Sequence, residues 1–269
     1  MGRLAGKRCV VVGAGQTPGD TIGNGRATAL RFAQEGGRVL CVDRNLASAQ
    51  ETVELIVNAG GEAMATQADV ADEQQCAQVI AGAQAQLGGV DVLHNNVGIG
   101  TGDTGPTGME LEVWERIFRV NLTSVMQLCK YALPLMREQG QGVITNISSV
   151  AAVCSVGIVA YKTSKAALNA YTHALAMGNA GRGIRANVIM PGLMNTPMAI
   201  EGNVAAGADR ASLIERRNRS VPLGGQMGDA WDVANAAVFL ASDEARFVTG
   251  LLMTVDGGSS LSAGAGQFE

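Results

Sequence analysis

Two side chains in the second half of the chain are spaced for acid–base chemistry. Tyr161 and Lys165 stand four residues apart in the run AYKTSKAALNAYTHALAM, whose pattern predicts a helix. Residues at i and i+4 lie on one helical face, so the phenol and the ammonium can point into one site. A neighbouring cation favours the phenolate and lowers the pKa of a tyrosine from about 10 toward the range of a general base. Because the same spacing occurs on solvated helices, the pair needs support from other elements.

A glycine-rich loop near the N-terminus could bind a phosphate group. The strand-like run 8–12 leads into GAGQTPGDTIGNG, residues 13–25, and an amphipathic helix follows. Glycines at a strand-to-helix turn let the backbone approach a pyrophosphate, whose charge is favoured at a helix N-terminus. A merely flexible turn is the alternative, but the position after the first strand favours a dinucleotide site.

The next strand-like run ends in a carboxylate that fits the same ligand. Asp43 closes RVLCVD, twenty residues beyond Gly23. A carboxylate there can accept both ribose hydroxyls of an adenosine and repel a 2′-phosphate. A strand-end aspartate that caps the following helix is the alternative interpretation. Arg44 could reach a 2′-phosphate, but the loop 13–25 holds no Lys or Arg, so the sequence favours NAD over NADP.

Short apolar runs alternate with helical patterns along the chain. The expected strands are 8–12, 38–43, 63–67, 90–95, 142–148, 184–190 and 251–256, and the expected helices lie near 23–36, 46–59, 72–87, 110–138, 160–180 and 229–242. Strands with little polar alternation, each followed by a helix, predict an α/β fold: a Rossmann-type doubly wound parallel sheet of about seven strands with helices on both faces. Ligands of such sheets bind at the carboxyl ends of the strands.

The pattern predicts a single NAD-binding catalytic domain over residues 1–269, with one unusual connection. The segment 193–228 bears glycines and methionines, shows no regular pattern and is long for a loop. We expect it to form a substrate-binding lid.

The composition of the chain argues against several classes of binding partner. The net charge of -4 comes without a basic stripe, which argues against nucleic acid, and no apolar run reaches the ~18 residues of a membrane span. The N-terminus enters a strand with no signal-peptide pattern. Five scattered cysteines, without a CxxC pair, and two histidines offer no metal site and favour a reducing compartment. We therefore expect a cytoplasmic protein with a small-molecule substrate, no metal and no membrane partner.

Several ordered motifs resemble those of the short-chain dehydrogenase/reductase family, in its single-domain branch. They are Asp69-Val70, Asn95-Asn96-Val97-Gly98, Asn121 in RVNLTSV, Ser148-Ser149 in NISSVAA, the Tyr161–Lys165 pair, Pro191-Gly192 with Thr196 in PGLMNT, and VTGLLMTVDGG near the C-terminus. The resemblance covers essentially the whole chain. Enoyl reductases related to the family space Tyr and Lys more widely, so the four-residue spacing favours alcohol chemistry.

The resemblance implies a role for each motif. Tyr161 would be the general acid/base, Lys165 would lower its pKa, Ser149 would donate to the substrate oxygen, and Asn121 would hold a proton-relay water. The implied cofactor-binding residues are Gly13, Gly23, Gly25, Asp43, Asp69, Val70, Asn95, Val97, Gly98, Tyr161, Lys165, Pro191, Gly192 and Thr196. The C-terminal strand would pack across the interface of a homotetramer.

The chain departs from the family pattern at two places. About six residues are inserted in the phosphate loop, which leaves 16–22 as a bulge and the contribution of Gly15 and Gly19 open. The catalytic serine usually stands thirteen residues before the tyrosine, a separation that belongs to Ser148, whereas Ser149 has the usual sequence context. We choose Ser149, since a deletion in a loop is easier than a register shift that turns a strand side chain to the other face.

The sequence therefore predicts an NAD-dependent oxidoreductase that interconverts a secondary alcohol and a ketone. A 3-oxoacyl-thioester reductase of fatty-acid type is the nearest alternative, although such reductases usually prefer NADPH. A redox regulator that binds NAD without turnover is the alternative from another class.

Overall fold

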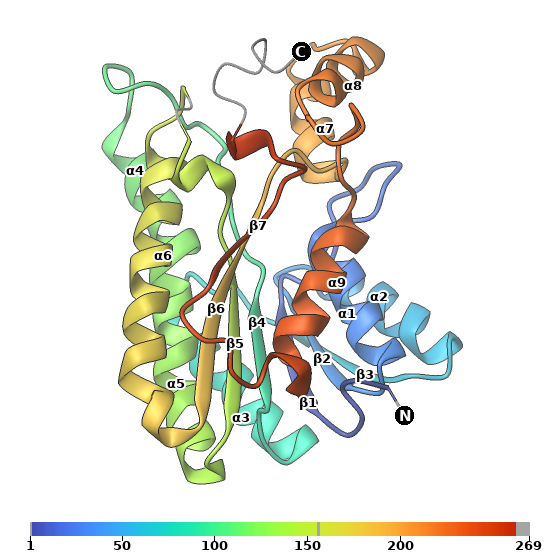
Figure 1. Ribbon diagram of the computed structural model, residues 1–269, viewed down its shortest axis with the longest axis vertical. Helices are drawn as coiled ribbons and strands as arrows, with labels where there is room; N and C mark the ends of the chain where they lie inside the picture. Colours follow the sequence, from blue (N-terminus) through green and yellow to red (C-terminus); the bar gives the residue numbers. More distant parts are fainter. Residues whose placement is uncertain (1, 155–156, 262–269) are drawn as a thin grey trace.

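Seven strands form one parallel sheet in the order β3-β2-β1-β4-β5-β6-β7 (Figure 1). The structure is a computed structural model that describes residues 2–154 and 157–261. The strands are β1 (Arg8–Val12), β2 (Arg38–Asp43), β3 (Glu62–Gln67), β4 (Val92–Asn95), β5 (Gly142–Ile147), β6 (Ile184–Pro191) and β7 (Leu252–Val255). Strand order reverses between β1 and β4, so the sheet is doubly wound and Rossmann-type, as expected, with its switch point beside β1.

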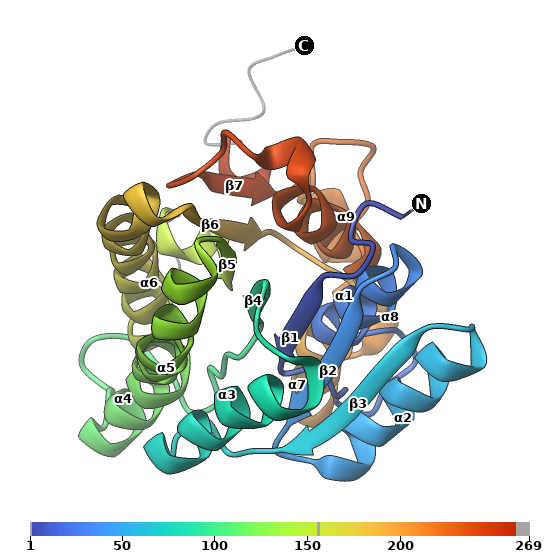
Figure 2. The same ribbon diagram turned by 90° about the horizontal axis from the view of Figure 1, so that it is seen from below.

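Helices cover both faces of the sheet (Figure 2). One core cluster joins the strands to α1 (Asn24–Gln34), α2 (Leu46–Asn58) and α9 (Ala230–Ala241). The other joins them to α3 (Glu73–Leu87), α5 (Ser124–Gln139) and α6 (Ala160–Asn179). Because successive strand residues point to opposite faces, Val10 belongs to one core and Val11 to the other. Apolar residues on both sides explain why the strands lack polar alternation.

The expected helix 110–138 has a local irregularity. It consists of α4 (Leu111–Phe118), a π-helical turn (Arg119–Thr123) and α5. Such single π turns occur often at functional sites, and this one carries the buried Asn121.

The segment 193–228 is not irregular as expected, because it contains two short helices, α7 (Pro197–Ala205) and α8 (Arg210–Arg219). Pro197 occupies the first turn of α7, where its missing N–H is no loss. Asp209 caps α8 by accepting the backbone N–H of Ser212. Both helices are too short and too evenly patterned to show a clear apolar face in the sequence. In Figure 1 they lie beyond one end of the sheet.

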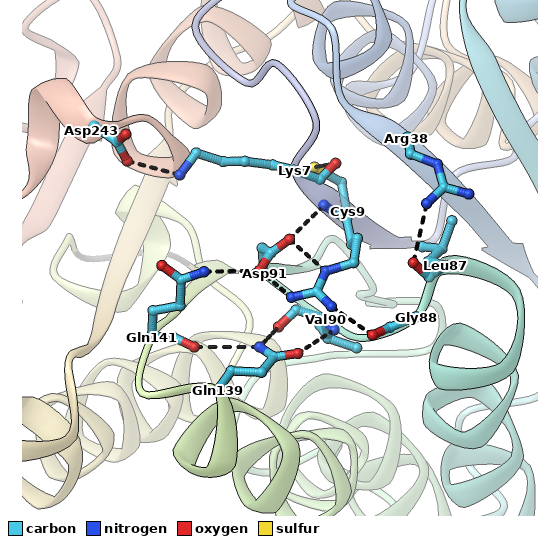
Figure 3. Close-up of polar contacts among 11 residues, drawn as sticks. Lys7, Cys9, Arg38, Leu87, Gly88, Val90, Asp91, Gln139, Gln141 and Asp243 are labelled. Carbon is cyan, nitrogen blue, oxygen red and sulfur yellow. Dashed lines mark hydrogen bonds and ion pairs between the residues drawn. The ribbon is translucent and has the colours of Figure 1, made fainter.

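A polar network ties the strands together at their amino ends (Figure 3). The Asp91 carboxylate accepts the Arg8 backbone N–H at 2.8 Å and the guanidinium at 2.7 Å through both Nε and Nη2. Gln139 exchanges two hydrogen bonds with the backbone of Val90. The network therefore fixes β1 against β4 and β5 at the edge opposite to the expected ligand site.

Among the described residues, no helix is both long and apolar enough to cross a membrane, and no group of three or more His, Cys, Asp or Glu could hold a metal ion.

Candidate active site

Lys165 lies on α6 beneath the carboxyl ends of β4 and β5. Its side chain is 2% exposed, and Nζ donates to the carbonyl oxygens of Ile147 at 2.7 Å and Val97 at 3.3 Å. A Cβ atom on Gly98 would lie 3.0 Å from Nζ, so the backbone packs directly against the ammonium. Burial disfavours the charge and lowers the pKa of Lys165 to about 7.

Tyr161 stands one turn before Lys165 on the same face of α6. The Lys165 Nζ lies 5.7 Å from the Tyr161 ring centroid, and the ring packs against Gly100. Burial raises the pKa of Tyr161, and a hydrogen bond with Ser149 opposes this rise without cancelling it. The pKa of Tyr161 therefore lies above its ordinary value, opposite to the direction expected from the sequence, because burial of the phenol outweighs the hydrogen bond with Ser149.

The two neighbouring serines face different partners. The Ser149 side chain hydrogen-bonds with Tyr161 and accepts the backbone N–H of Ala151 at 3.1 Å. Ser148 is 2% exposed, and its Oγ donates to the Lys165 carbonyl oxygen at 3.0 Å. Geometry thus favours Ser149 as the serine that shares a site with the Tyr161 hydroxyl, whereas Ser148 fastens α6 to the sheet.

Asn121 is fully buried in the π-helical turn and holds the loop after β4. Its Oδ1 accepts the backbone N–H of Ile99 at 2.8 Å, and its Nδ2 donates to the Ile99 carbonyl oxygen and to Ser164 Oγ, each at 3.0 Å. Because Ser164 lies between Tyr161 and Lys165 on α6, Asn121 links the helix that carries the pair to the loop above β4.

The phosphate loop folds so tightly that its ends touch. Gly13 has a φ of +79°, which favours glycine, and a Cβ atom on Gly25 would lie 1.8 Å from the Gly13 carbonyl oxygen. The Asn96 side chain donates to that same oxygen at 3.2 Å. Only backbone fits between the end of β1 and the start of α1, as a bound pyrophosphate requires.

Asp43 closes the adenosine side of this loop. Its Oδ2 accepts the Gly15 backbone N–H and its Oδ1 accepts that of Asn45, each at 2.9 Å. A Cβ atom on Gly15 would lie 2.7 Å from the carboxylate, so this position requires glycine. A Cβ atom on Gly23, by contrast, would lie 3.9 Å from its nearest neighbour, a side-chain carbon of Gln16. The Gly23 backbone N–H donates to the Gln16 side chain. Packing gives no reason for a glycine there, and a cofactor contact of Gly23 stays a prediction.

The remaining expected cofactor residues occupy the same edge of the sheet. Asp69 and the buried Val70 follow β3, and Asn95 donates to Asn146 at 2.8 Å at the end of β4. Pro191 ends β6, and a Cβ atom on the next residue, Gly192, would lie 2.5 Å from Asp256. Thr196 is buried at the start of α7.

Three residues contribute to this arrangement without having been chosen from the sequence: Gly15, Asn96 and Asp103. Asn96 had its signal in the NNVG motif, and Gly15 in the loop composition. Asp103 had none, because its partners lie more than fifty residues away in the chain: the backbone N–H groups of Val159, Ala160 and Tyr161.

The inserted part of the phosphate loop contacts the segment with α7 and α8. Arg210 on α8 forms a two-bond ion pair with Glu201 on α7, at 2.9 and 2.6 Å, and lies 3.5 Å from the carboxylate of Asp20 in the loop. Gly19 lies against Pro197 and Glu201, and a Cβ atom on it would meet both within 3.0 Å. The cofactor loop and the segment expected to cover the substrate are therefore in direct contact.

Known proteins are similar to this chain in sequence and in fold. A family profile described as "Enoyl-(Acyl carrier protein) reductase" matches residues 20–260. The chain is 37% identical over 263 residues to 2,5-dichloro-2,5-cyclohexadiene-1,4-diol dehydrogenase LinX of Sphingobium indicum, covering 96% of this chain and 98% of LinX. It is 39% identical over 264 residues to 3beta-hydroxysteroid dehydrogenase 1 of Eggerthella lenta, covering 97% and 96%.

A solved structure of 7 alpha-hydroxysteroid dehydrogenase, complexed with NADH and 7-oxo glycochenodeoxycholic acid, superposes with a TM-score of 0.85 at 32% identity, covering 95% of each chain. The chain described here belongs to the short-chain dehydrogenase/reductase family. It is an oxidoreductase of the family's alcohol-dehydrogenase type with a site for a nicotinamide cofactor. The close contact of Gly13 with Gly25, which leaves no room for a side chain, and the carboxylate at the end of β2 fit such a dinucleotide.

Proposed function

We propose that the chain interconverts a secondary alcohol and a ketone with NAD, and that Tyr161 is the general acid/base. The observation that carries the proposal is the convergence of Tyr161, Ser149 and Lys165 at the carboxyl edge of the sheet, next to the glycine loop. A nicotinamide, when bound, accepts a hydride from the alcohol carbon or returns it to the ketone.

The side chains divide the remaining work. In oxidation Tyr161 takes the hydroxyl proton, and in reduction it returns this proton to the ketone oxygen. Ser149 donates a hydrogen bond to that oxygen, where negative charge develops. Lys165 donates to two carbonyl oxygens, and we infer that its third N–H serves the cofactor. Asn121 keeps the loop above β4 closed on α6, and we infer that a water held there passes the proton outward.

The choice of NAD rests on Asp43. Its two oxygens each accept one backbone N–H, which leaves lone pairs for ribose hydroxyls. A 2′-phosphate at the same place would meet a fixed negative charge. Arg44 is exposed, and the hydrogen bond that it receives from Gln67 ends on its backbone carbonyl oxygen and does not involve its guanidinium.

We infer the substrate class from the relatives and from three methionines near the end of β6. Two of the related dehydrogenases are named for a cyclohexadiene diol and a steroid, both ring-bearing secondary alcohols. In this chain Met190 and Met194 are buried near the end of β6, and Met198 on α7 is 56% exposed. We infer a cyclic, largely apolar alcohol, covered by the segment 193–228 as a lid.

Turnover measured at the reduced-nicotinamide absorbance band tests this proposal. The panel holds cyclohexanol, a hydroxysteroid and a 3-hydroxyacyl thioester, each with NAD and with NADP. We expect oxidation of a cyclic alcohol with NAD, and Tyr161→Phe should bind NADH as the parent does, by fluorescence, but lose turnover by several orders of magnitude. Full activity of Tyr161→Phe would overturn the assignment, and equal rates with NADP would overturn the argument from Asp43.

Other outcomes favour the alternatives. Selective turnover of the thioester with NADPH would indicate the fatty-acid type of reductase. NADH binding without turnover of any alcohol would indicate a redox regulator.

We infer a homotetramer in which β7, the edge strand of the sheet, takes part in an interface. Phe247, just before this strand, is 97% exposed. Light scattering of the purified protein should give about four times the 27.6 kDa chain mass. A cytoplasmic location stays a prediction.

A further inference from the structure

The helix that carries Tyr161 and Lys165 has no cap of its own. Its N-cap residue is Val159, whose side chain cannot accept a hydrogen bond. A distant carboxylate replaces the cap: one oxygen of Asp103 accepts the backbone N–H groups of Val159 and Ala160, each at 3.1 Å, and the other accepts that of Tyr161 at 2.7 Å. The shortest of these bonds thus ends on the backbone of Tyr161 itself.

Asp103 ends a short segment that contacts the whole candidate site. Within residues 97–103, the Val97 carbonyl oxygen accepts from Lys165, Ile99 is bound by Asn121, and Gly100 packs on the Tyr161 ring. A turn then closes the segment, since the Asp103 backbone N–H donates to the Gly100 carbonyl oxygen at 3.1 Å and Gly102 has a φ of +84°. The segment is therefore fixed at one end by β4 and at the other by the first turn of α6.

We propose that Asp103 is a positioning residue for Tyr161. The proposal rests on the proposed function, because it concerns the placement of the general acid/base. Tyr161 is the second residue of α6, within the turn that frays first when its N–H groups lose their acceptors. Asp103 keeps this turn formed and holds the Tyr161 hydroxyl at Ser149, and small displacements of a reacting group cost rate steeply.

Two substitutions separate positioning from simple capping. Asp103→Asn leaves one acceptor oxygen for the three N–H groups and places an NH2 group where the other carboxylate oxygen accepted. Asp103→Ala removes both carboxylate oxygens and leaves only the Thr104 carbonyl oxygen, 3.2 Å from the Val159 nitrogen, as an acceptor. We expect Asp103→Asn to lower kcat for the fastest alcohol of the panel by about ten- to a hundredfold, with the affinity for NADH within about twofold of the parent. Asp103→Ala should lose at least as much, and Asp103→Glu should recover part of the rate.

A matched control removes a helix cap elsewhere. Asp72 caps α3 by accepting the backbone N–H groups of Gln74 and Gln75 at 2.8 and 3.4 Å. Asp72→Ala should lower Tm about as Asp103→Ala does and leave kcat at 25 °C unchanged. Amide hydrogen exchange should accelerate at residues 159–161 only in the Asp103 variants.

The outcomes distinguish this proposal from the proposed function. Parental kcat in Asp103→Asn, with Tyr161→Phe inactive, would overturn the positioning role alone. A loss of kcat that follows Tm equally in Asp72→Ala and Asp103→Ala would also overturn it. Full activity in Tyr161→Phe would instead overturn the proposed function.

Discussion

The pKa of Tyr161 sets the pH range in which the site can accept a proton. Burial raises this pKa, and the hydrogen bond with Ser149 opposes part of the rise. Alcohol oxidation requires the phenolate and should become faster as the pH rises toward the pKa of Tyr161. Ketone reduction requires the phenol and should become slower over the same range.

Ser149→Ala should therefore move the rising limb of alcohol oxidation to higher pH. The substitution removes the bond that lowers the pKa of Tyr161 and the donor to the substrate oxygen, so kcat should also fall by about a hundredfold. The profile of kcat against pH checks both effects.

Ser148→Ala is the matched control for this profile. It removes only the hydrogen bond to the Lys165 carbonyl oxygen, so the limb should stay in place. If Ser148→Ala moves the limb and Ser149→Ala does not, the assignment of the two serines is reversed.

Residue types were easier to predict than residue contacts. Tyr161, Lys165 and Asp43 could be chosen from the sequence because each follows a recognisable strand or lies at a helical spacing. Asp103 could not, since nothing local indicates that a carboxylate will meet a helix start 58 positions later. The direction of the pKa shift of Tyr161 was missed for the same reason: burial is a property of the fold.

At the scale of elements, all seven strands lie within two residues of their expected bounds. The central strands are predictable because they are buried, continuous apolar runs. The expected helix 110–138 contains a π-helical turn that the spacing of apolar residues does not indicate. The pair α7 and α8 was missed because short helices without a strong apolar face look like loops. What could not be predicted is concentrated beside the site, where geometry departs from regular patterns.

The ion pairs of Arg210 suggest that the inserted loop and the helices α7 and α8 act together. Arg210→Met would remove the contacts with Glu201 and Asp20, which join α8 to α7 and to the loop 16–22. Because these groups are partly exposed, we expect KM for the alcohol to rise by no more than about fivefold, with kcat little changed. Initial rates over a range of alcohol concentrations measure this split.

Arg219→Met provides the comparison on the same helix. Arg219 pairs with Glu215 within α8 and does not reach the loop, so its loss should leave KM at the parental value. Equal KM values in both arginine variants would contradict a link between loop and lid.

At the scale of the whole molecule, the two edges of the sheet have separate tasks. The glycine loop, Asp43 and the Tyr161 site occupy the carboxyl edge, and the network of Arg8 and Asp91 occupies the amino edge (Figure 3). Since strands β1, β4 and β5 connect the two edges, the amino-edge network holds the strands that support the site without touching it. Stability and activity should therefore be separable by mutation.

Asp91→Asn tests this separation. Burial alone would raise the pKa of Asp91, but its hydrogen bonds with Arg8 and the charge of Arg8 outweigh burial and lower it. The side chain is 12% exposed, and the substitution leaves three Arg8 donors poorly paired. The free energy of unfolding should therefore fall by about 1–3 kcal/mol. Each kcal/mol corresponds to a fall in Tm of roughly 2–4 °C. A carboxyl with a lowered pKa stabilises the fold fully above its unfolded pKa of about 3.9. This contribution is lost as the pH falls toward the folded value.

The Tm difference between parent and Asp91→Asn should thus be constant at neutral pH and shrink below about pH 4, where the carboxyl of the unfolded chain becomes protonated while that of the folded protein stays ionised. Asp243→Asn is the control in the same network. Asp243 is 87% exposed, and among the residues drawn in Figure 3 it pairs only with Lys7. The Tm of Asp243→Asn should therefore match that of the parent. Turnover at 25 °C should be parental in both variants, since neither residue approaches the carboxyl edge. A Tm difference in Asp91→Asn that persists unchanged at pH 3 would show that Asp91 acts through packing and not through its charge.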